Sequence, residues 1–209
     1  MGDERRPALL RGGDGRARCW WCGHDPAYVA YHDHEWGRAE HDDLRLFEKL
    51  VLEGFQAGLS WLTILRRRDR LRAAFADFDP ERMAAFDAAD VRRLLADDRL
   101  IRNRAKVEAA IANARRYLRL REQGETLDEV VWAFAPAPRP RPTSRLEVPA
   151  TTPESTALAR ELKRRGWRFV GPTTAYAFMQ SMGLVDDHIA GCFRGGDDVG
   201  AQHPTRQAP

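Results

Sequence analysis

Helix start and stop signals recur along this chain, and almost no stretch alternates apolar and polar residues as a half-buried strand does. Asp25, Asp42 and Ser60 each stand directly before a segment that can form a helix, and Gly124 follows the longest such segment. The pattern predicts an all-α fold. A chain of 209 residues that is 43% hydrophobic can bury one core or two small lobes without disulfides.

Three stretches lack a helical pattern. Residues 135–153, "APAPRPRPTSRLEVPATTP", are rich in proline and cannot continue a helix, so we expect a surface connection between two packed parts. We expect a disordered extension over residues 1–18 and a disordered tail over residues 194–209, which is rich in Gly, Asp and Pro. The predicted folded unit is therefore 19–193.

Composition limits the compartment and the partners. No window approaches the apolar length of a membrane span, and the N-terminus lacks the apolar stretch of a signal peptide, so we expect a cytoplasmic protein without a membrane partner. The formal charge of +3 favours a polyanionic partner without requiring one. Local clusters of charged residues therefore say more about a partner than the net charge does.

The stretch "LVDDHIAGC" places His188 and Cys192 four positions apart, which on a helix puts both on one face and within reach of one ion. Zinc prefers four ligands, so further ligands must come from elsewhere in the chain. The N-terminal segment offers several, namely Cys19, Cys22, His24, His32 and His34. By spacing alone, the Cys19–Cys22 pair is the first choice.

Two other interpretations of these residues stay open. An isolated histidine and cysteine are often an ordinary surface or core histidine and a small buried side chain. The pair of Cys19 and Cys22 could also serve thiol redox chemistry, although no βαβ pattern surrounds it.

Several stretches, in order and with unusual tryptophans and glycines, resemble one known family. They are "RCWW", "DPAYVAYHDHEWG", "LFEKLVLEGFQAGLSW", "FDPERMA", "IRNRAKVEAAIANA" and "KRRGWRFVGPTTAYAFMQSMGLVDDHIAGC", spanning roughly residues 18–193. The chain resembles the type I 3-methyladenine DNA glycosylases of bacteria. The resemblance implies a two-lobed, all-α helix-hairpin-helix fold in a monomer that acts on double-stranded alkylated DNA in the nucleoid. It also implies hydrolysis of the N-glycosidic bond of 3-methyladenine, which releases the free base and leaves an abasic site without lyase activity.

The resemblance further implies one zinc ion that joins the two ends of the chain. Its ligands would be Cys19, His32, His188 and Cys192, so that His32 takes the place that spacing alone gives to Cys22. Four protein ligands leave no open position for activating water, so the role of this zinc would be structural.

For the base pocket, the resemblance implies Trp21, Tyr28, Tyr31, Glu53 and Trp61, with Glu53 and Tyr31 as the catalytic residues. A glycosylase swings the damaged nucleotide out of the duplex and holds its base against aromatic faces. A 3-alkylated adenine carries a positive charge, which suits electron-rich rings and a nearby carboxylate. The alternative for the aromatic residues is ordinary core packing. Glu53 stands among apolar neighbours, where a carboxylate must find a donor or face a cavity.

The stretch "LARELKRRGWRFVGPTTAYAFMQ" indicates a helix, a tight turn and a second helix, and it resembles the helix-hairpin-helix element of repair glycosylases. Gly171 would let a DNA backbone approach closely, and the amides that start the second helix could bind a phosphate, with hydroxyl donors from Thr173 and Thr174. Lys163 and Arg168 add positive charge beside the turn. The alternative for the charged residues is a solvated helix face.

Two questions remain open at this stage. Many helix-hairpin-helix glycosylases carry an aspartate a little after the hairpin, and Asp186 stands at a comparable distance, although the type I family is not credited with it. A non-enzymatic DNA-binding protein could also keep the metal ligands and the hairpin, but it would not need Tyr28, Tyr31, Glu53 and Trp61.

Overall fold

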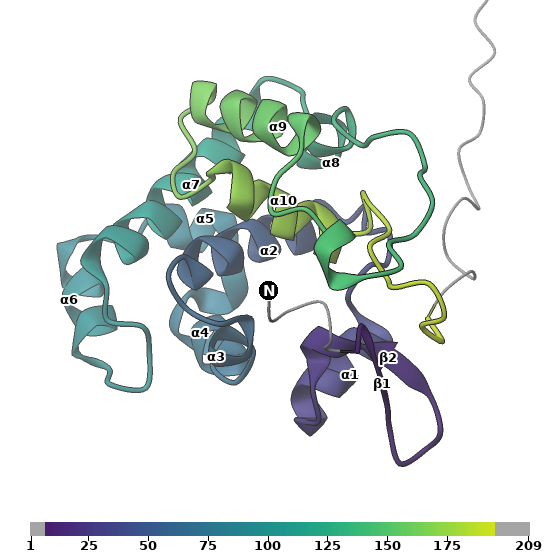
Figure 1. Cartoon of the computed structure of the whole chain (residues 1–209). Helices are drawn as coiled ribbons and strands as arrows, with labels where there is room; N and C mark the ends of the chain where they lie inside the picture. Colours follow the sequence, from purple (N-terminus) through teal and green to yellow (C-terminus); the bar gives the residue numbers. More distant parts are fainter. Residues whose placement is uncertain (1–6, 195–209) are drawn as a thin grey trace, which may run out of the picture.

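The computed structural model describes residues 7–194, and helices dominate this part of the chain (Figure 1). The helices are α1 (Pro26–His34), α2 (Asp43–Gln56), α3 (Trp61–Leu65), α4 (Arg68–Ala74), α5 (Pro80–Ala84), α6 (Ala88–Ala96), α7 (Arg104–Glu122), α8 (Leu127–Trp132), α9 (Pro153–Arg164) and α10 (Pro172–Ser181). Short 3-10 turns are η1 (Trp20–Cys22), η2 (Ala76–Phe78) and η3 (Arg145–Glu147). The predominantly helical fold is confirmed. None of the described helices is long and apolar enough to cross a membrane.

Local capping explains where these helices begin. The side chain of Asp25 accepts hydrogen bonds from the amides of Ala27 and Tyr28, and Asp42 and Ser60 cap α2 and α3 in the same way. Gly124 follows α7 with a φ of +78°, which a glycine adopts without strain. The segment after Ser60 forms two short helices, α3 and α4, where the sequence predicts one.

Helix α2 is the central element, because α10, α7, α3 and α8 all pack against it (Figure 1). Its buried apolar side chains are Leu46, Phe47, Leu50, Val51, Leu52 and Phe55. Two charged residues of the same helix, Lys49 and Glu53, are only 5% and 3% exposed. A charged pair inside the core of a small protein is costly, which marks this part of α2 as a functional candidate.

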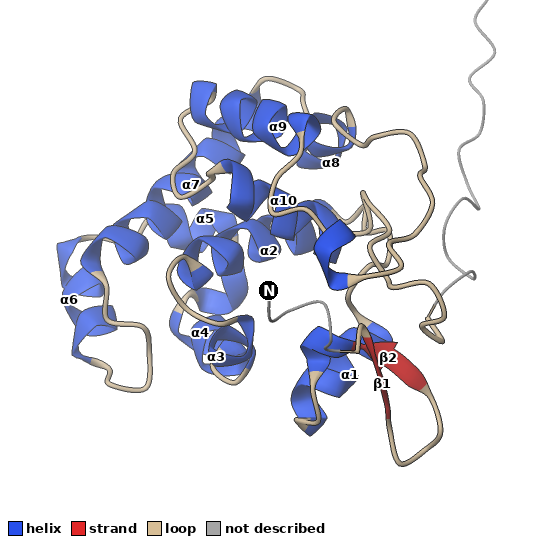
Figure 2. Ribbon diagram, in the orientation of Figure 1, coloured by secondary structure: helices blue, strands red, loops and turns tan. Residues whose placement is uncertain are grey.

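The N-terminal segment corrects one prediction. Within the described residues, the expected disordered extension instead forms a hairpin of β1 (Leu9–Arg11) and β2 (Ala17–Cys19), seen in red in Figure 2. The buried guanidinium of Arg18 holds it to α1 through Asp33, and Phe193 donates its amide to the carbonyl of Ala17. These long-range contacts order a strand pair that has little local signal. Residues 1–6 and 195–209, including most of the predicted tail, lie outside the described residues.

The proline-rich segment 135–153 is irregular apart from η3, and it is tied to the C-terminal part of the chain. Arg139 pairs with Asp187, and Arg141 pairs with Asp186. The carbonyl of Pro142 also accepts a hydrogen bond from the amide of Ala190. This segment therefore helps to fix the stretch that carries two of the predicted metal ligands.

The expected helix that joins His188 to Cys192 is absent, because residues 182–194 form turns and extended chain. Gly183 follows α10 with a φ of +74°. The carboxylate of Asp186 accepts the amide of His188, and Gly191 bends the chain back with a φ of +88°. A turn here brings the two side chains together as well as a helix would.

Candidate functional site

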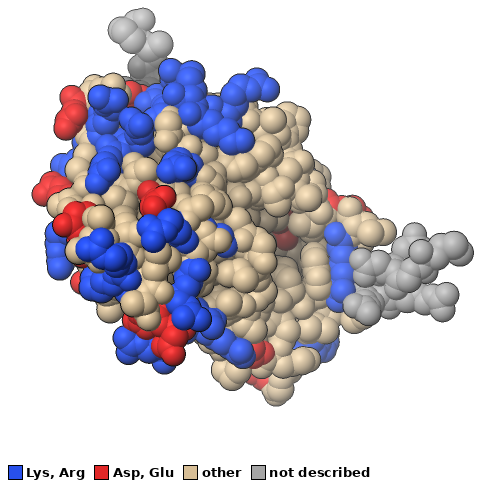
Figure 3. Space-filling view, turned by 90° about the vertical axis from the view of Figure 1, so that its left-hand side faces the viewer, with Lys and Arg blue, Asp and Glu red and all other residues tan. Residues whose placement is uncertain are grey.

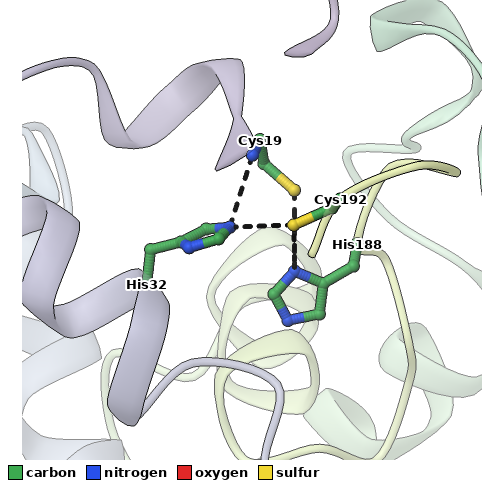
Figure 4. A group of neighbouring side chains, drawn as sticks. All are labelled: Cys19, His32, His188 and Cys192. Carbon is green, nitrogen blue, oxygen red and sulfur yellow. Dashed lines mark hydrogen bonds between the residues drawn. The ribbon is translucent and has the colours of Figure 1, made fainter. Parts of the chain in front are cut away.

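Four buried side chains from distant parts of the chain converge at one point, as Figure 4 shows. They are Cys19 at the end of β2, His32 in α1, and His188 and Cys192 in the C-terminal segment. Their ligand atoms all lie within 4.8 Å of one another. Sγ of Cys192 is 3.4 Å from Nε2 of His32 and 3.6 Å from Nδ1 of His188. This metal cluster could therefore hold one metal ion.

Neighbouring groups orient both histidines. Asp33 Oδ1 lies 2.8 Å from Nδ1 of His32, and a carboxylate there keeps the ring proton on Nδ1, so that Nε2, which accepts the amide of Cys19 at 3.3 Å, presents its lone pair to the cluster. Arg18 in turn holds Asp33 at 2.7 Å. On the other side, a side chain at Gly37 would come within 2.9 Å of Nε2 of His188, so glycine is needed at that position to seat the ring.

The pKa values of the two cluster thiols are shifted in opposite directions. Hydrogen bonding with Cys19 lowers the pKa of the Cys192 thiol below its usual range, and the same contact raises the pKa of Cys19. Cys22 points elsewhere, because its thiol contacts the carbonyl of Cys19 at 3.1 Å. The choice of Cys22 by spacing alone is therefore wrong for the described cluster, and the set with His32 is the one that converges.

A cavity of about 210 Å³ lies beside the metal cluster, between α1, α2 and α10. We call it the base cavity; its lining includes Trp21, Tyr28, Tyr31, Glu53 and Trp61, together with Trp20, Trp36, Gln56, Val148, Ala177, Gln180 and Asp187. All five predicted pocket residues line it. Tyr31 and Trp61 are also part of the buried core, so these rings both pack in the core and line a cavity.

The aromatic rings stand at steep angles around this space. The centroids of Tyr31 and Trp61 are 5.3 Å apart, and those of Trp21 and Trp36 are 4.8 Å apart. Burial raises the pKa of Tyr28 to about 12 and keeps the pKa of Tyr31 well above its ordinary value, so both phenols stay protonated at neutral pH. The cavity therefore offers neutral hydroxyls and ring faces to a flat ligand.

Glu53 is the buried acid of the base cavity, and a lysine one turn earlier binds it. Nζ of Lys49 lies 2.9 Å from Oε1 of Glu53 and 2.7 Å from the hydroxyl of Tyr31. Burial raises the pKa of Glu53, and the Lys49 ammonium opposes part of that rise. The indole Nε1 of Trp61 is buried and has no hydrogen-bond partner in the described part of the chain.

The turn between α9 and α10 is braced by other helices. The side chain of Asn113 in α7 binds both the amide and the carbonyl of Arg168, at 2.9 and 3.1 Å. Phe169 has a φ of +57°, and a side chain at Gly54 in α2 would come within 3.3 Å of its Cβ. The turn is therefore held rigidly against the helix that carries Glu53.

The start of α10 leaves room for a ligand. Gly171 has an ordinary φ of −72°, and a Cβ added there would meet nothing within 4 Å. No side chain caps α10, and Thr173 is exposed. Lys163 and Arg168 are exposed and make no ion pair within residues 7–194, whereas Arg164 and Arg165 are paired with acidic residues.

Comparison with known proteins gives a consistent result. The family model described as methyladenine glycosylase matches residues 21–195. The chain belongs to the methyladenine glycosylase family. It is 49% identical over 177 residues to DNA-3-methyladenine glycosylase 1 of Escherichia coli strain K12, covering 84% of this chain and 95% of that protein. It is 48% identical to DNA-3-methyladenine glycosylase of Haemophilus influenzae, covering 84% and 96%.

Solved structures of this glycosylase family have the same fold. A crystal structure of 3-methyladenine DNA glycosylase I matches with a TM-score of 0.83 and 50% identity, covering 85% of this chain and 98% of that one. A second structure, of the Staphylococcus aureus glycosylase and its recognition of 3-methyladenine, matches with a TM-score of 0.79 and 33% identity over 84% and 94% of the two chains.

Two residues at the base cavity of this methyladenine glycosylase, Lys49 and Asp187, were not predicted from the sequence. Lys49 was missed, although its spacing of four from Glu53 on an apolar helix face was a usable signal. Asp187 lines the base cavity and binds Arg139, Tyr176 and Gln180, whereas the considered Asp186 does not line it and pairs with Arg141. No local pattern distinguishes these neighbours, because tertiary packing decides which one faces the cavity.

Proposed function

We propose that this glycosylase hydrolyses the N-glycosidic bond of 3-methyladenine in double-stranded alkylated DNA, as the names of its relatives imply for them. The observation that carries the proposal is the base cavity, which combines aromatic faces with one buried carboxylate, Glu53. A flipped, positively charged purine needs these two features for binding. We expect the protein to act as a monomer.

In the proposed complex, the base stacks on the rings of Trp61 and Tyr31, and Trp21 and Tyr28 close the sides. Glu53 accepts hydrogen bonds from the amino edge of the base, and the hydroxyl of Tyr31 donates to a ring nitrogen. The base leaves with the electron pair of the bond between C1′ and N9 and becomes neutral. Water adds its oxygen to C1′ and releases a proton, so the products are a free base and an abasic site. We expect no lyase activity.

A basic helix-hairpin-helix element is proposed to hold the DNA. The uncapped amides at the start of α10 would bind a phosphate, with Gly171 giving access and Thr173 and Thr174 donating hydroxyls. Lys163 and Arg168 would add charge that does not depend on sequence. Figure 3 shows most of the visible Lys and Arg, interspersed with Asp and Glu, on one half of this face, beside a mostly uncharged and hollowed surface, which suits a strand that places one nucleotide in a cavity.

We further propose that the metal cluster binds one zinc ion. Zinc bonds of roughly 2.0–2.3 Å in a tetrahedron put neighbouring ligand atoms roughly 3.3–3.8 Å apart. The observed separations of 3.4 and 3.6 Å around Cys192 agree with this spacing. Cys19, His32, His188 and Cys192 would fill all four positions, so the ion would fasten the N-terminal hairpin and α1 to the C-terminal segment without taking part in hydrolysis.

The test is the release of bases from methylated duplex DNA, followed by chromatography of the free bases. We expect release of 3-methyladenine by the wild-type chain and a fall of about 100-fold or more for Glu53→Gln, which loses the charge that faces the base. Glu48→Gln is the matched control, because Glu48 lies on the same helix but binds Arg72 outside the base cavity. Equal release by wild type and Glu53→Gln would contradict the role of Glu53, and no release by wild type would contradict the proposed activity.

A further inference from the structure

The ammonium group of Lys49 touches three residues of the base cavity at once. Besides its contacts with Glu53 and Tyr31, Nζ lies 3.3 Å from the centroid of the Trp61 ring. Lys49 does not line the base cavity; it lines a second cavity of about 410 Å³ that shares Tyr31 and Trp61 as its wall. The lysine therefore lies behind Tyr31 and Trp61, on the side away from the base cavity.

The direction of these hydrogen bonds follows from chemistry. An ammonium can only donate, so the oxygen of Tyr31 must accept, and the phenol proton is left to point elsewhere. Oε1 of Glu53 is likewise used by Lys49, and no other hydrogen bond to Glu53 is present within residues 7–194. Lys49 thus leaves one donor, the Tyr31 hydroxyl, and one acceptor, Oε2 of Glu53, for a ligand.

The charge of Lys49 acts on Glu53 directly. Burial raises the pKa of Glu53 and lowers the pKa of Lys49, and the contact of 2.9 Å between the two groups opposes both shifts. Other titratable or charged groups also face this pair. Glu35 and Arg68 bind each other, and the exposed His34 lines the second cavity. The remaining groups are Tyr28, Tyr31 and Asp187, which line the base cavity. Because Asp187 binds Arg139 and Arg68 binds Glu35, Lys49 is the direct cationic partner of Glu53 in the described chain.

We propose that Lys49 is a positioning residue of the excision reaction: it keeps Glu53 ionised and directs the Tyr31 hydroxyl as a donor toward the base. The proposal rests on the function proposed above. A base methylated at N3 within DNA has a fixed positive charge. The fall of the excision rate at low pH, here called the acid limb of the pH profile, therefore reports the protonation of a group of the enzyme rather than of the substrate. Lys49 therefore sets the pH at which the enzyme begins to work.

The test is the pH profile of single-turnover excision for the wild-type chain and for Lys49→Met and Lys49→Gln, with folding checked by circular dichroism. Loss of an opposite charge this close should move the acid limb upward by about one to three pH units. Lys49→Arg, which keeps the charge, should hold the limb close to that of wild type. In the Glu53→Gln background, Lys49→Met should cause no further shift of the acid limb, because the carboxylate whose ionisation it reports is gone, while any loss of rate measures the effect on Tyr31.

A matched control separates charge from packing. Lys106 is also buried, but its ammonium binds the carbonyls of Phe55 and Ala57 near the end of α2 rather than a pocket side chain. Lys106→Met should lower stability and leave the acid limb in place, as should His34→Gln for the exposed histidine. A folded Lys49→Met or Lys49→Gln enzyme with the wild-type acid limb would overturn the proposal.

A second measurement does not depend on activity. Carbon-13 NMR of Glu-labelled protein, with Glu53→Gln to assign the signal, should show Glu53 titrating at higher pH in Lys49→Met and Lys49→Gln than in wild type. If wild type excises nothing, the proposed function fails while this titration still tests Lys49. If wild type excises and the Glu53 titration is unmoved in both variants, only the role of Lys49 fails.

Discussion

The metal cluster and the base cavity are both buried groups of polar side chains, but the chain completes only one of them. In the metal cluster, each ligand atom has neighbours in the chain, and Asp33 backs His32. In the base cavity, Nε1 of Trp61 has no partner in the described chain, and Glu53 has Lys49 alone. Buried polar groups are normally satisfied. This difference fits the proposed roles, a structural metal site for the cluster and a base-binding site for the cavity.

The largest expected effect comes from breaking the metal cluster. His188→Ala or Cys192→Ala should abolish binding of the proposed ion and lower the free energy of unfolding by about 4 kcal/mol or more, because that ion would join the two ends of the folded unit. Metal content by mass spectrometry and urea unfolding measure this. A chelator should have the same effect on wild type.

Cys22→Ala is the matched control for that prediction. Cys22 is buried beside the cluster, yet its thiol contacts a carbonyl and no ligand atom. The variant should keep one zinc per chain. A chain in which Cys22→Ala loses the metal and His188→Ala retains it would reverse the assignment.

The metal cluster also shows how far the sequence leads. Local signals such as Asp25, Asp42 and Gly124 predict helix ends correctly, because a cap depends on a few neighbouring residues. The spacing of Cys19 and Cys22 says nothing about where each thiol points, and in the fold they point apart. Only the resemblance to a family supplied His32.

A moderate effect is expected from the carboxylate behind His32. Asp33→Asn should weaken zinc binding by about 10-fold to 100-fold, because the ring then loses the acceptor that fixes its proton on Nδ1. Competition with a chromogenic chelator measures the affinity. Asp14→Asn is the control, since Asp14 also binds Arg18 but is half exposed and touches no ligand. Equal zinc affinity in all three proteins would show that the cluster needs no such support.

The sequence predicted the aromatic residues and the acid of the base cavity, but not the hydrogen bonds and ion pairs that hold them. Family resemblance pointed to Glu53 and the rings, yet Lys49 and Asp187 enter the site through packing between α2, α1 and the C-terminal segment. The proposed role of Gly171 in binding a phosphate likewise follows from no local rule. Its backbone angles suit any residue, so only the empty space in front of it explains the glycine.

A substitution at Gly171 should have the smallest effect on stability, but it should weaken DNA binding. Gly171→Ala should leave the free energy of unfolding unchanged, because the added methyl group meets nothing within 4 Å. It should weaken binding to duplex DNA by about tenfold, since the methyl group would hold a phosphate away from the amides of α10. Gly183→Ala provides the contrast. Gly183 has a φ of +74°, and a Cβ added there would lie 2.4 Å from the backbone of Ala39. This variant should therefore unfold the chain. If Gly171→Ala binds DNA as well as wild type, the start of α10 is no phosphate site, and the base cavity is left as the candidate ligand site within residues 7–194.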